Sequence, residues 1–259
     1  MNKIQPLLTV DNLSKNYGLT QACNDISFTL YSGQVLGIVG ESGSGKSTLL
    51  KAIAGFLSIE QGKINYLNRQ EKWLDFQQIS ESHRRQLMRT EWGFVQQNPR
   101  DGLRMNITAG ANIGERLMDV GVRNYGKIRQ EIAYWLQQVE IDCRWMDELP
   151  TTFSGGMQQR LQIARVLVTQ PRLILMDEPT GGLDVSVQAR LLDLLRSLVR
   201  TLNLSVILVT HDLGVVRLLA HRLFVMKNGK IVEYGLTDQV LDDPQHPYTQ
   251  QLVSSTLIP

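Results

Sequence analysis

One run of residues in the chain has the composition of a phosphate-binding loop. Gly40 to Ser47 reads Gly-Glu-Ser-Gly-Ser-Gly-Lys-Ser and follows an apolar run, which is the P-loop pattern in its expected strand-to-helix setting. Gly43 and Gly45 let the backbone curl so that successive amide hydrogens face one phosphate. Lys46 would reach the β and γ oxygens, and the Ser47 hydroxyl would bind Mg²⁺. A glycine-rich turn without a ligand is the alternative, and the flanking elements disfavour it.

An acidic pair follows a second apolar run. Leu173 to Met176 are all apolar, and Asp177 and Glu178 come directly after them. Such a run predicts a buried strand whose carboxyl end lies at the ligand-binding edge of a parallel sheet. There Asp177 could hold Mg²⁺, and Glu178 could accept a proton from an attacking water. An acidic pair alone more often caps the next helix. With a P-loop upstream, we interpret this pair as a metal ligand and a base.

Two further features would complete the site. His211 ends the apolar run Val206 to Thr210. A lone histidine is more often structural, but we expect this strand to lie beside the Asp177 strand, where His211 would contact the γ-phosphate and hold the water and the base. Ser154 to Gln158 combine an N-cap with two glycines at a predicted helix start, which exposes backbone amides to an anion. An ordinary cap would explain Ser154 but not the glycines.

The elements that must position these residues follow from hydrophobic periodicity. Short strand-like runs fill the first third and predict a mixed, partly antiparallel sheet: Leu7 to Val10, Ile26 to Leu30, Val35 to Val39, Lys63 to Leu67 and Gly93 to Gln96. Ile128, Ile132, Trp135, Leu136 and Val139 recur at helical spacing and predict a helical lobe. Helices and strands then alternate: a helix at 156–169, a strand at 173–176, a helix at 185–201, a strand at 206–210 and a helix from 212. This order predicts an α/β fold with a parallel sheet covered by helices.

Composition limits the class of protein. The 259 residues, 42% of them hydrophobic, can bury one substantial core. The 27 basic and 25 acidic residues nearly balance, which argues against a nucleic-acid partner. Two cysteines, Cys23 and Cys143, suggest a reducing compartment. The first ten residues lack a signal pattern, and no apolar run approaches the roughly 20 residues of a bilayer span. We therefore expect a cytoplasmic protein without direct membrane insertion.

The order of these motifs carries a family resemblance. The P-loop, Gln97, Ser154-Gly155-Gly156-Met157-Gln158, Asp177-Glu178, Gly182-Leu183-Asp184 and His211 together resemble the nucleotide-binding domain of ATP-binding-cassette (ABC) proteins over nearly the whole chain. The resemblance implies a P-loop NTPase fold with a mixed sheet, an antiparallel N-terminal subdomain and a helical subdomain. It implies one domain over 1–259, with a RecA-like core at 1–97 and 170–259 and the helical subdomain at about 98–169.

The resemblance also implies site residues. The catalytic residues would be Glu178, His211 and Gln97, and the Mg²⁺ ligands Ser47, Gln97 and Asp177. ATP would be bound by Tyr17, Gly40, Ser42, Gly43, Ser44, Gly45, Lys46, Ser47, Thr48, Ser154, Gly155, Gly156, Gln158 and Asp184. Tyr17 matches the aromatic that stacks on adenine, although turn packing would also explain it. Gln96 competes with Gln97 for the metal-sensing role, and Pro99 favours Gln97. One departure is Gly181-Gly182, where many relatives have Ser-Ala or Asn-Ala.

By the same resemblance the chain is an ATPase that hydrolyses MgATP as a head-to-tail dimer, with Ser154 to Gln158 facing the γ-phosphate held by the second copy. Two clients compete. The stretches Arg89 to Val95, Asp101 to Arg104, Ala111 to Leu117, Thr151 to Ser154 and Met176 to Arg190 closely resemble cassette ATPases of phosphonate carbon–phosphorus lyase systems. The partners would then be lyase core subunits, with a second ABC-type protein in the same assembly.

The end of the chain supports another interpretation. Asp242 to Thr249 is similar to ATP-binding subunits of peptide and nickel importers. Those commonly continue into a cysteine-containing tail, whereas this chain ends at Pro259, which favours the lyase. Arg100, Asp101, Arg104, Glu115 and Arg116 make the surface after Gln97 polar, as a soluble partner would allow, or as any solvated face would be. A nucleotide-gated assembly factor without turnover is a third possibility, and Glu178 and His211 count against it.

Overall fold

A six-stranded sheet forms the centre of the molecule. The computed structural model describes residues 5–256, and its main sheet has the strand order β10-β9-β3-β8-β7-β6. The strands are β3 (Val35–Val39), β6 (Trp92–Val95), β7 (Leu173–Asp177), β8 (Ser205–Val209), β9 (Arg222–Lys227) and β10 (Lys230–Leu236). All neighbours are parallel except β9 and β10, which are antiparallel. Every residue of β3, β7 and β8 is buried, as expected for parallel strands covered on both faces.

A second, antiparallel sheet is built from the N-terminal part. It contains β1 (Pro6–Tyr17), β2 (Thr20–Tyr31), β4 (Gln61–Leu67) and β5 (Trp73–Asp75), in the order β2-β1-β4-β5. The expected fold, a mixed sheet with a parallel core and an antiparallel N-terminal subdomain, is confirmed. The strand-like runs of the first third do not form a single sheet, however, because β3 and β6 belong to the main sheet. Both are fully or nearly fully buried, whereas β1 and β2 have exposed positions between buried ones. That difference separates parallel core strands from strands with one covered face.

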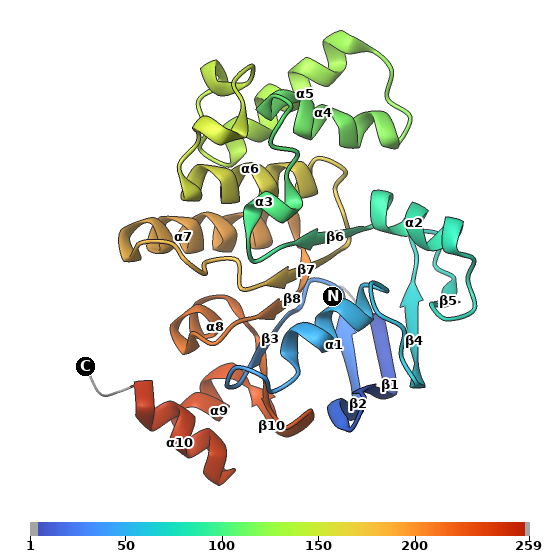
Figure 1. Cartoon of the computed structure of the whole chain (residues 1–259), viewed down its shortest axis with the longest axis vertical. Helices are drawn as coiled ribbons and strands as arrows, with labels where there is room; N and C mark the ends of the chain where they lie inside the picture. Colours follow the sequence, from blue (N-terminus) through green and yellow to red (C-terminus); the bar gives the residue numbers. More distant parts are fainter. Residues whose placement is uncertain (1–4, 257–259) are drawn as a thin grey trace.

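Helices cover the main sheet and form a lobe at one end of the molecule (Figure 1). They are α1 (Lys46–Ile53), α2 (Glu81–Thr90), α3 (Pro99–Gly102), α4 (Ala109–Asp119), α5 (Tyr125–Gln138), α6 (Gly155–Leu167), α7 (Val185–Leu202), α8 (Leu213–Leu219), α9 (Thr237–Asp242) and α10 (Pro247–Thr256). In α5 the predicted stripe of Ile128, Ile132, Trp135 and Leu136 is buried. Thr108 and Asn124 cap α4 and α5 through their side chains. The division at 98–169 stays a prediction.

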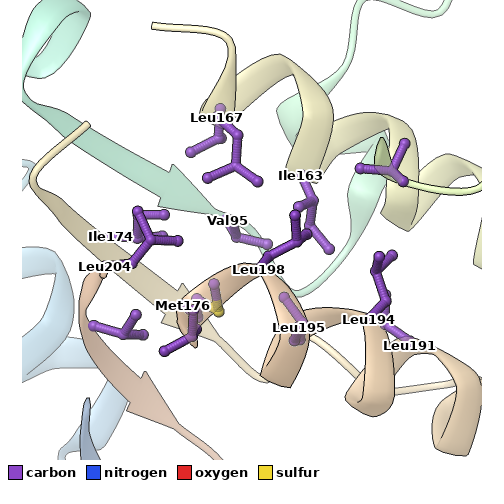
Figure 2. Packing of buried hydrophobic residues seen from close by; sticks show 14 of the residues in the cluster. Val95, Ile163, Leu167, Ile174, Met176, Leu191, Leu194, Leu195, Leu198 and Leu204 are labelled. Carbon is purple, nitrogen blue, oxygen red and sulfur yellow. The ribbon is translucent and has the colours of Figure 1, made fainter. Parts of the chain in front are cut away.

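Leucines of α7 connect the helical lobe to the sheet. Leu191, Leu194, Leu195 and Leu198 are nearly or fully buried and belong to one hydrophobic cluster with residues of strand β7 and helix α6 (Figure 2). Their spacing of three and four residues places them on one helix face. This packing holds the carboxyl end of β7 in place. Within residues 5–256, no helix is long and apolar enough to cross a membrane.

Candidate active site

The loop between β3 and α1 adopts the curled path that its glycines predict. Gly40, Gly43 and Gly45 have φ angles of 151°, 81° and 106°, a region that side chains disfavour. A Cβ at Gly40 would lie 2.2 Å from the carbonyl oxygen of Met226, and one at Gly45 would lie 2.0 Å from that of Ala22. The loop therefore runs against the backbone of β9 and of β2. Only glycine allows this close approach.

Lys46 is the buried cation of the loop. Its side chain donates to the carbonyl oxygens of Gly40 at 2.8 Å and Glu41 at 2.7 Å, and the residue is 5% exposed. Burial lowers the pKa of Lys46, while the carboxylates of Glu178, Asp177 and Glu41 act in the opposite direction. Its third partner, the Ser44 hydroxyl at 3.4 Å, is also neutral, and a buried ammonium with only neutral partners gains from an arriving anion. Lys46 is thus placed to bind phosphate oxygens.

Ser47 and Asp177 bring two hard oxygen ligands together. The Ser47 hydroxyl donates to Oδ1 of Asp177 at 2.9 Å, and Asp177 is 4% exposed. Burial raises the pKa of Asp177, while the Ser47 hydrogen bond lowers it. A hydroxyl and one carboxylate fit Mg²⁺, which takes its other ligands from phosphates and water. No cluster of three or more His, Cys, Asp or Glu residues suited to a metal occurs within residues 5–256.

Two side chains contact the carboxylate of Glu178, one at each oxygen. Gln97 Nε2 donates to Oε2 at 3.1 Å, and His211 Nδ1 lies 3.0 Å from Oε1. The expectation that the His211 strand neighbours the Asp177 strand is confirmed, because β7 and β8 pair in parallel with Asp177 opposite Val209. Glu178 itself has φ +44°, a strained conformation for a residue with a side chain. Such strain is typical of functional sites.

The choice between Gln96 and Gln97 is visible in their contacts. The backbone N–H of Gln96 donates to Oε1 of Gln162 at 2.6 Å, and its carbonyl accepts from Nε2 of the same residue at 3.2 Å. Gln96 thus anchors its strand to α6. The side chain of Gln97 is directed to Glu178. Of the two glutamines, only Gln97 extends from the end of β6 toward the predicted base.

A cavity of about 740 Å³ joins most of the predicted residues. It is lined by Tyr17, Thr20, Ala22, Ser42, Gly43, Gly45, Lys46, Ser47, Thr48, Gln97, Glu178 and His211. Tyr17 is 51% exposed, so its ring is accessible to a flat ligand. Thr20 and Ala22 were not predicted, because they lie on β2 outside any motif. Gly40 and Ser44 do not line the cavity. Ser44 is buried, and its carbonyl oxygen accepts the N–H of Gly229 at 3.0 Å.

A second group of predicted residues does not line this cavity. Ser154 caps α6 by accepting the N–H of Met157 at 3.3 Å, and Ser154 and Gly155 are exposed. A Cβ at Gly156 would lie 2.4 Å from Cγ1 of Val187, so α6 begins tightly against α7. Asp184 is the N-cap residue of that helix, without a side-chain capping bond. The start of α6 therefore presents accessible amides beside the Asp184 loop.

Gln158 occupies a different environment from the one expected of a nucleotide ligand. It is 5% exposed, and its Nε2 donates to the carbonyl oxygens of Pro150 and Phe153 at 2.9 and 3.2 Å. An amide held inside the protein cannot reach a ligand on the surface. The side chain of Gln158 therefore supports the loop before Ser154, and any contribution to binding is indirect.

The polar surface after Gln97 is partly engaged within the chain. Arg104 forms an ion pair with Glu115, and Arg116 donates to the carbonyl oxygens of Met88 and Arg89. Arg100 and Asp101 are exposed. The glutamate and Arg116 thus stabilise this face, which leaves Arg100 and Asp101 more accessible to a partner.

The chain is similar to several known proteins. The family described as "ABC transporter" matches residues 23–181, and one described as "AAA domain, putative AbiEii toxin, Type IV TA system" matches residues 148–217. "Putative phosphonates utilization ATP-binding protein PhnK" of Escherichia coli (strain K12) is 64% identical over 98% of each chain. "Dipeptide transport ATP-binding protein DppD" of Bacillus subtilis (strain 168) is 36% identical over 97% of this chain and 77% of that protein. A solved dimeric structure of a post-hydrolysis state of the ATP-binding cassette MJ0796, bound to ADP and Pi, has a TM-score of 0.80 and 27% identity, and covers 89% of this chain and 99% of that one.

Proposed function

The chain belongs to the ABC family of ATPases, and from that membership we propose that its hydrolysis of ATP drives a carbon–phosphorus lyase core complex during organophosphonate catabolism. The observation that carries the proposal is the 64% identity with the phosphonates utilization relative, which extends over 98% of both chains. The dipeptide transport relative is 36% identical. An importer ATPase is the second candidate, because that relative also matches nearly the whole chain.

The proposed chemistry assigns roles to the phosphate loop, to Asp177 behind it and to the groups around Glu178. Lys46 and the amides of the loop bind the β- and γ-phosphates. Ser47 and Asp177 would hold Mg²⁺, which would supply positive charge to neutralise the phosphate oxygens. A water attacks the γ-phosphorus, the bond from that phosphorus to the β,γ-bridging oxygen breaks, and the water proton passes to Glu178. The contacts of Gln97 and His211 with Glu178 support their assignment to positioning the base.

We propose that turnover requires a second copy of the chain. Ser154 and Gly155 offer amides at a helix start but lie outside the lining of the nucleotide cavity. In a head-to-tail dimer these amides would face the γ-phosphate held by the partner's loop. The dimeric cassette bound to ADP and Pi supports this arrangement. Two nucleotides would then be sandwiched between two copies, so that hydrolysis changes the affinity of the copies for each other.

The client is proposed to dock on a groove next to Gln97. A cavity of about 320 Å³ is lined by apolar residues, among them Phe56, Met88 and Phe94, and by arginines, among them Arg104 and Arg116. Phe56 is 52% exposed and packs against Phe94 with ring centroids 5.0 Å apart. A partly exposed aromatic pair beside arginines is typical of protein interfaces. Because β6 connects this groove to Gln97, docking there would be coupled to the base.

The test is purification of the tagged chain from its native cells, grown on a phosphonate. The starting material is the cytoplasmic fraction, where we expect the chain. Lyase core subunits should co-purify with the wild type and be lost with Phe56→Asp. The matched control is Tyr125→Asp, since Tyr125 is 71% exposed and lies on α5, away from the groove. Both variants should keep their ATPase activity. Recovery of membrane permeases in place of lyase subunits would overturn the proposal in favour of an importer.

A further inference from the structure

The C-terminal helix contacts the nucleotide loop. The hydroxyl oxygen of Tyr248, the second residue of α10, accepts a hydrogen bond from the backbone N–H of Glu41 at 2.9 Å, although the two residues are 207 positions apart. Tyr248 is 7% exposed. Figure 1 shows α10 at the C-terminal end of the chain, on the side of the loop that precedes α1. The mechanism above uses no residue of this helix.

The contacted N–H belongs to the peptide unit between Gly40 and Glu41. The carbonyl of that same unit accepts from Lys46 Nζ at 2.8 Å. A trans peptide is planar, and its N–H and C=O point in opposite directions. Tyr248 therefore holds the N–H of a rigid peptide group whose C=O contacts the ammonium of Lys46. Any rotation of this peptide group would move its carbonyl away from Lys46.

The peptide group between Gly40 and Glu41 is preceded by a glycine, whose backbone is flexible. Gly40 has φ +151°, and glycine has more accessible backbone conformations than other residues. The tyrosine hydroxyl supplies the hydrogen bond that selects one of them. Without it, the Glu41 N–H would lack a buried partner, which favours another orientation of the peptide.

Tyr248 is itself held from several directions. Lys227 Nζ lies 4.4 Å from the centroid of its ring, which is a cation–π contact. The N–H of Tyr248 donates to Nδ1 of His246 at 3.1 Å. The carboxylate of Glu233 accepts the N–H groups of Gln245 and His246 at 2.8 and 2.9 Å. The loop before α10 is thus anchored to β10, and the ring cannot drift from the nucleotide loop.

We propose that Tyr248 is a positioning residue for ATP binding, which acts on Lys46 through the Gly40–Glu41 peptide. The inference rests on the proposed role of Lys46 in binding phosphate. Removal of the hydroxyl leaves the ring and its packing in place but releases the peptide. Lys46 then keeps its bond to the Glu41 carbonyl but loses its fixed partner at Gly40, so part of the binding free energy is spent on ordering the ammonium. Because Lys46 contacts phosphate in the ground state and in the transition state alike, the effect falls on affinity more than on kcat.

The experiment compares three variants of the full chain for ATP affinity at equilibrium, for kcat at saturating ATP and for thermal stability. Tyr248→Phe should raise the Kd for ATP about three- to tenfold, the size of one hydrogen bond, with kcat changed less than about twofold. Tyr66→Phe is the matched control. Tyr66 lies on β4 of the antiparallel sheet, and its buried hydroxyl donates to Glu91 at 2.9 Å. This substitution should lower the melting temperature without changing the Kd. Lys46→Ala should raise the Kd much further.

The outcomes distinguish the positioning role of Tyr248 from the phosphate-binding role of Lys46. An unchanged Kd in Tyr248→Phe together with a raised Kd in Lys46→Ala would overturn the positioning role and leave the phosphate role of Lys46 intact. A Kd that Lys46→Ala leaves unchanged would refute the role of Lys46, and the inference with it. An equal rise in Tyr66→Phe and Tyr248→Phe would show a general loss of stability, which also overturns the proposal.

Discussion

Nδ1 of His211 lies 3.0 Å from Oε1 of Glu178, while the other carboxylate oxygen accepts from Gln97. The carboxylate is therefore held at both oxygens by groups that follow β6 and β8, the strands on either side of β7, and its side chain is 18% exposed. Such a carboxylate has one orientation, and it lines the cavity together with the phosphate loop. A base that accepts a proton from water in the transition state needs this restricted geometry.

The first prediction concerns this base. Glu178→Gln keeps the size of the side chain and one acceptor oxygen but cannot accept the proton. We expect phosphate release to fall by about 10²–10⁴-fold, whereas ATP binding is retained. Glu131→Gln on α5, an exposed position, is the control and should behave as the wild type. Equal rates of phosphate release in Glu178→Gln and in the wild type would exclude Glu178 as the base.

The second prediction is that Asp177→Asn raises the stability of the protein while it removes hydrolysis. Burial raises the pKa of this carboxyl, so between its ordinary pKa and the raised value the folded protein binds more protons than the unfolded chain. The free energy of unfolding therefore decreases as the pH rises through that range. Asp177→Asn removes this cost while its Oδ1 can still accept from Ser47. We expect a melting temperature a few degrees higher at pH 7, since about 1 kcal/mol corresponds to roughly 2–4 °C in a domain of this size.

The measurement is thermal unfolding without nucleotide at several pH values. The difference between Asp177→Asn and the wild type should shrink toward acid pH, where the carboxyl becomes protonated. At the same time the variant should lose Mg²⁺-dependent hydrolysis, because a neutral amide is a weaker ligand for a hard cation. A lower melting temperature for Asp177→Asn at pH 7 would contradict the prediction.

The third prediction tests the shared site. Ser154→Arg places a bulky side chain at the exposed start of α6, and Lys46→Ala removes the phosphate ligand, so each variant alone should lack turnover. In a mixture, a heterodimer has one site with both changes and one with neither. We expect such mixtures to recover up to about a quarter of the wild-type rate, from random pairing of two inactive variants. If each pure variant is inactive and the mixture is inactive as well, a head-to-tail site is refuted.

The sequence predicted the part of the site that local pattern determines. Apolar runs identified β3, β7 and β8, and the residue after each run lies at the same sheet edge, which is why Asp177 and His211 could be placed together. The helix α2 was missed, because Leu87 is its one fully buried residue and a polar helix has no strong periodicity. The hairpin of β9 and β10 was also missed, although Asn228-Gly229 at its turn is a recognisable signal.

Other features depend on contacts between distant parts of the chain. No pattern near Glu178 indicates its positive φ, because that conformation is imposed by the tertiary structure around the end of β7. The inward position of Gln158 depends on the loop at Pro150 and Phe153. The contact of Tyr248 with Glu41 joins residues from the two ends of the chain. Such pairs become visible only when the topology is known.

The last prediction concerns the core that holds the site in place. Leu195 of α7 is 2% exposed and belongs to the same buried cluster as Ile174 and Met176 of β7 (Figure 2), so Leu195→Ala would leave a cavity in the core that supports the strand ending in Asp177. We expect the free energy of unfolding to fall by about 2–5 kcal/mol, as measured by denaturant unfolding. The control is Leu19→Ala, the same substitution at a fully exposed position of the β1–β2 turn, which should change stability by less than about 0.5 kcal/mol. Equal losses in both variants would show that α7 does not stabilise the sheet in the way that its packing indicates.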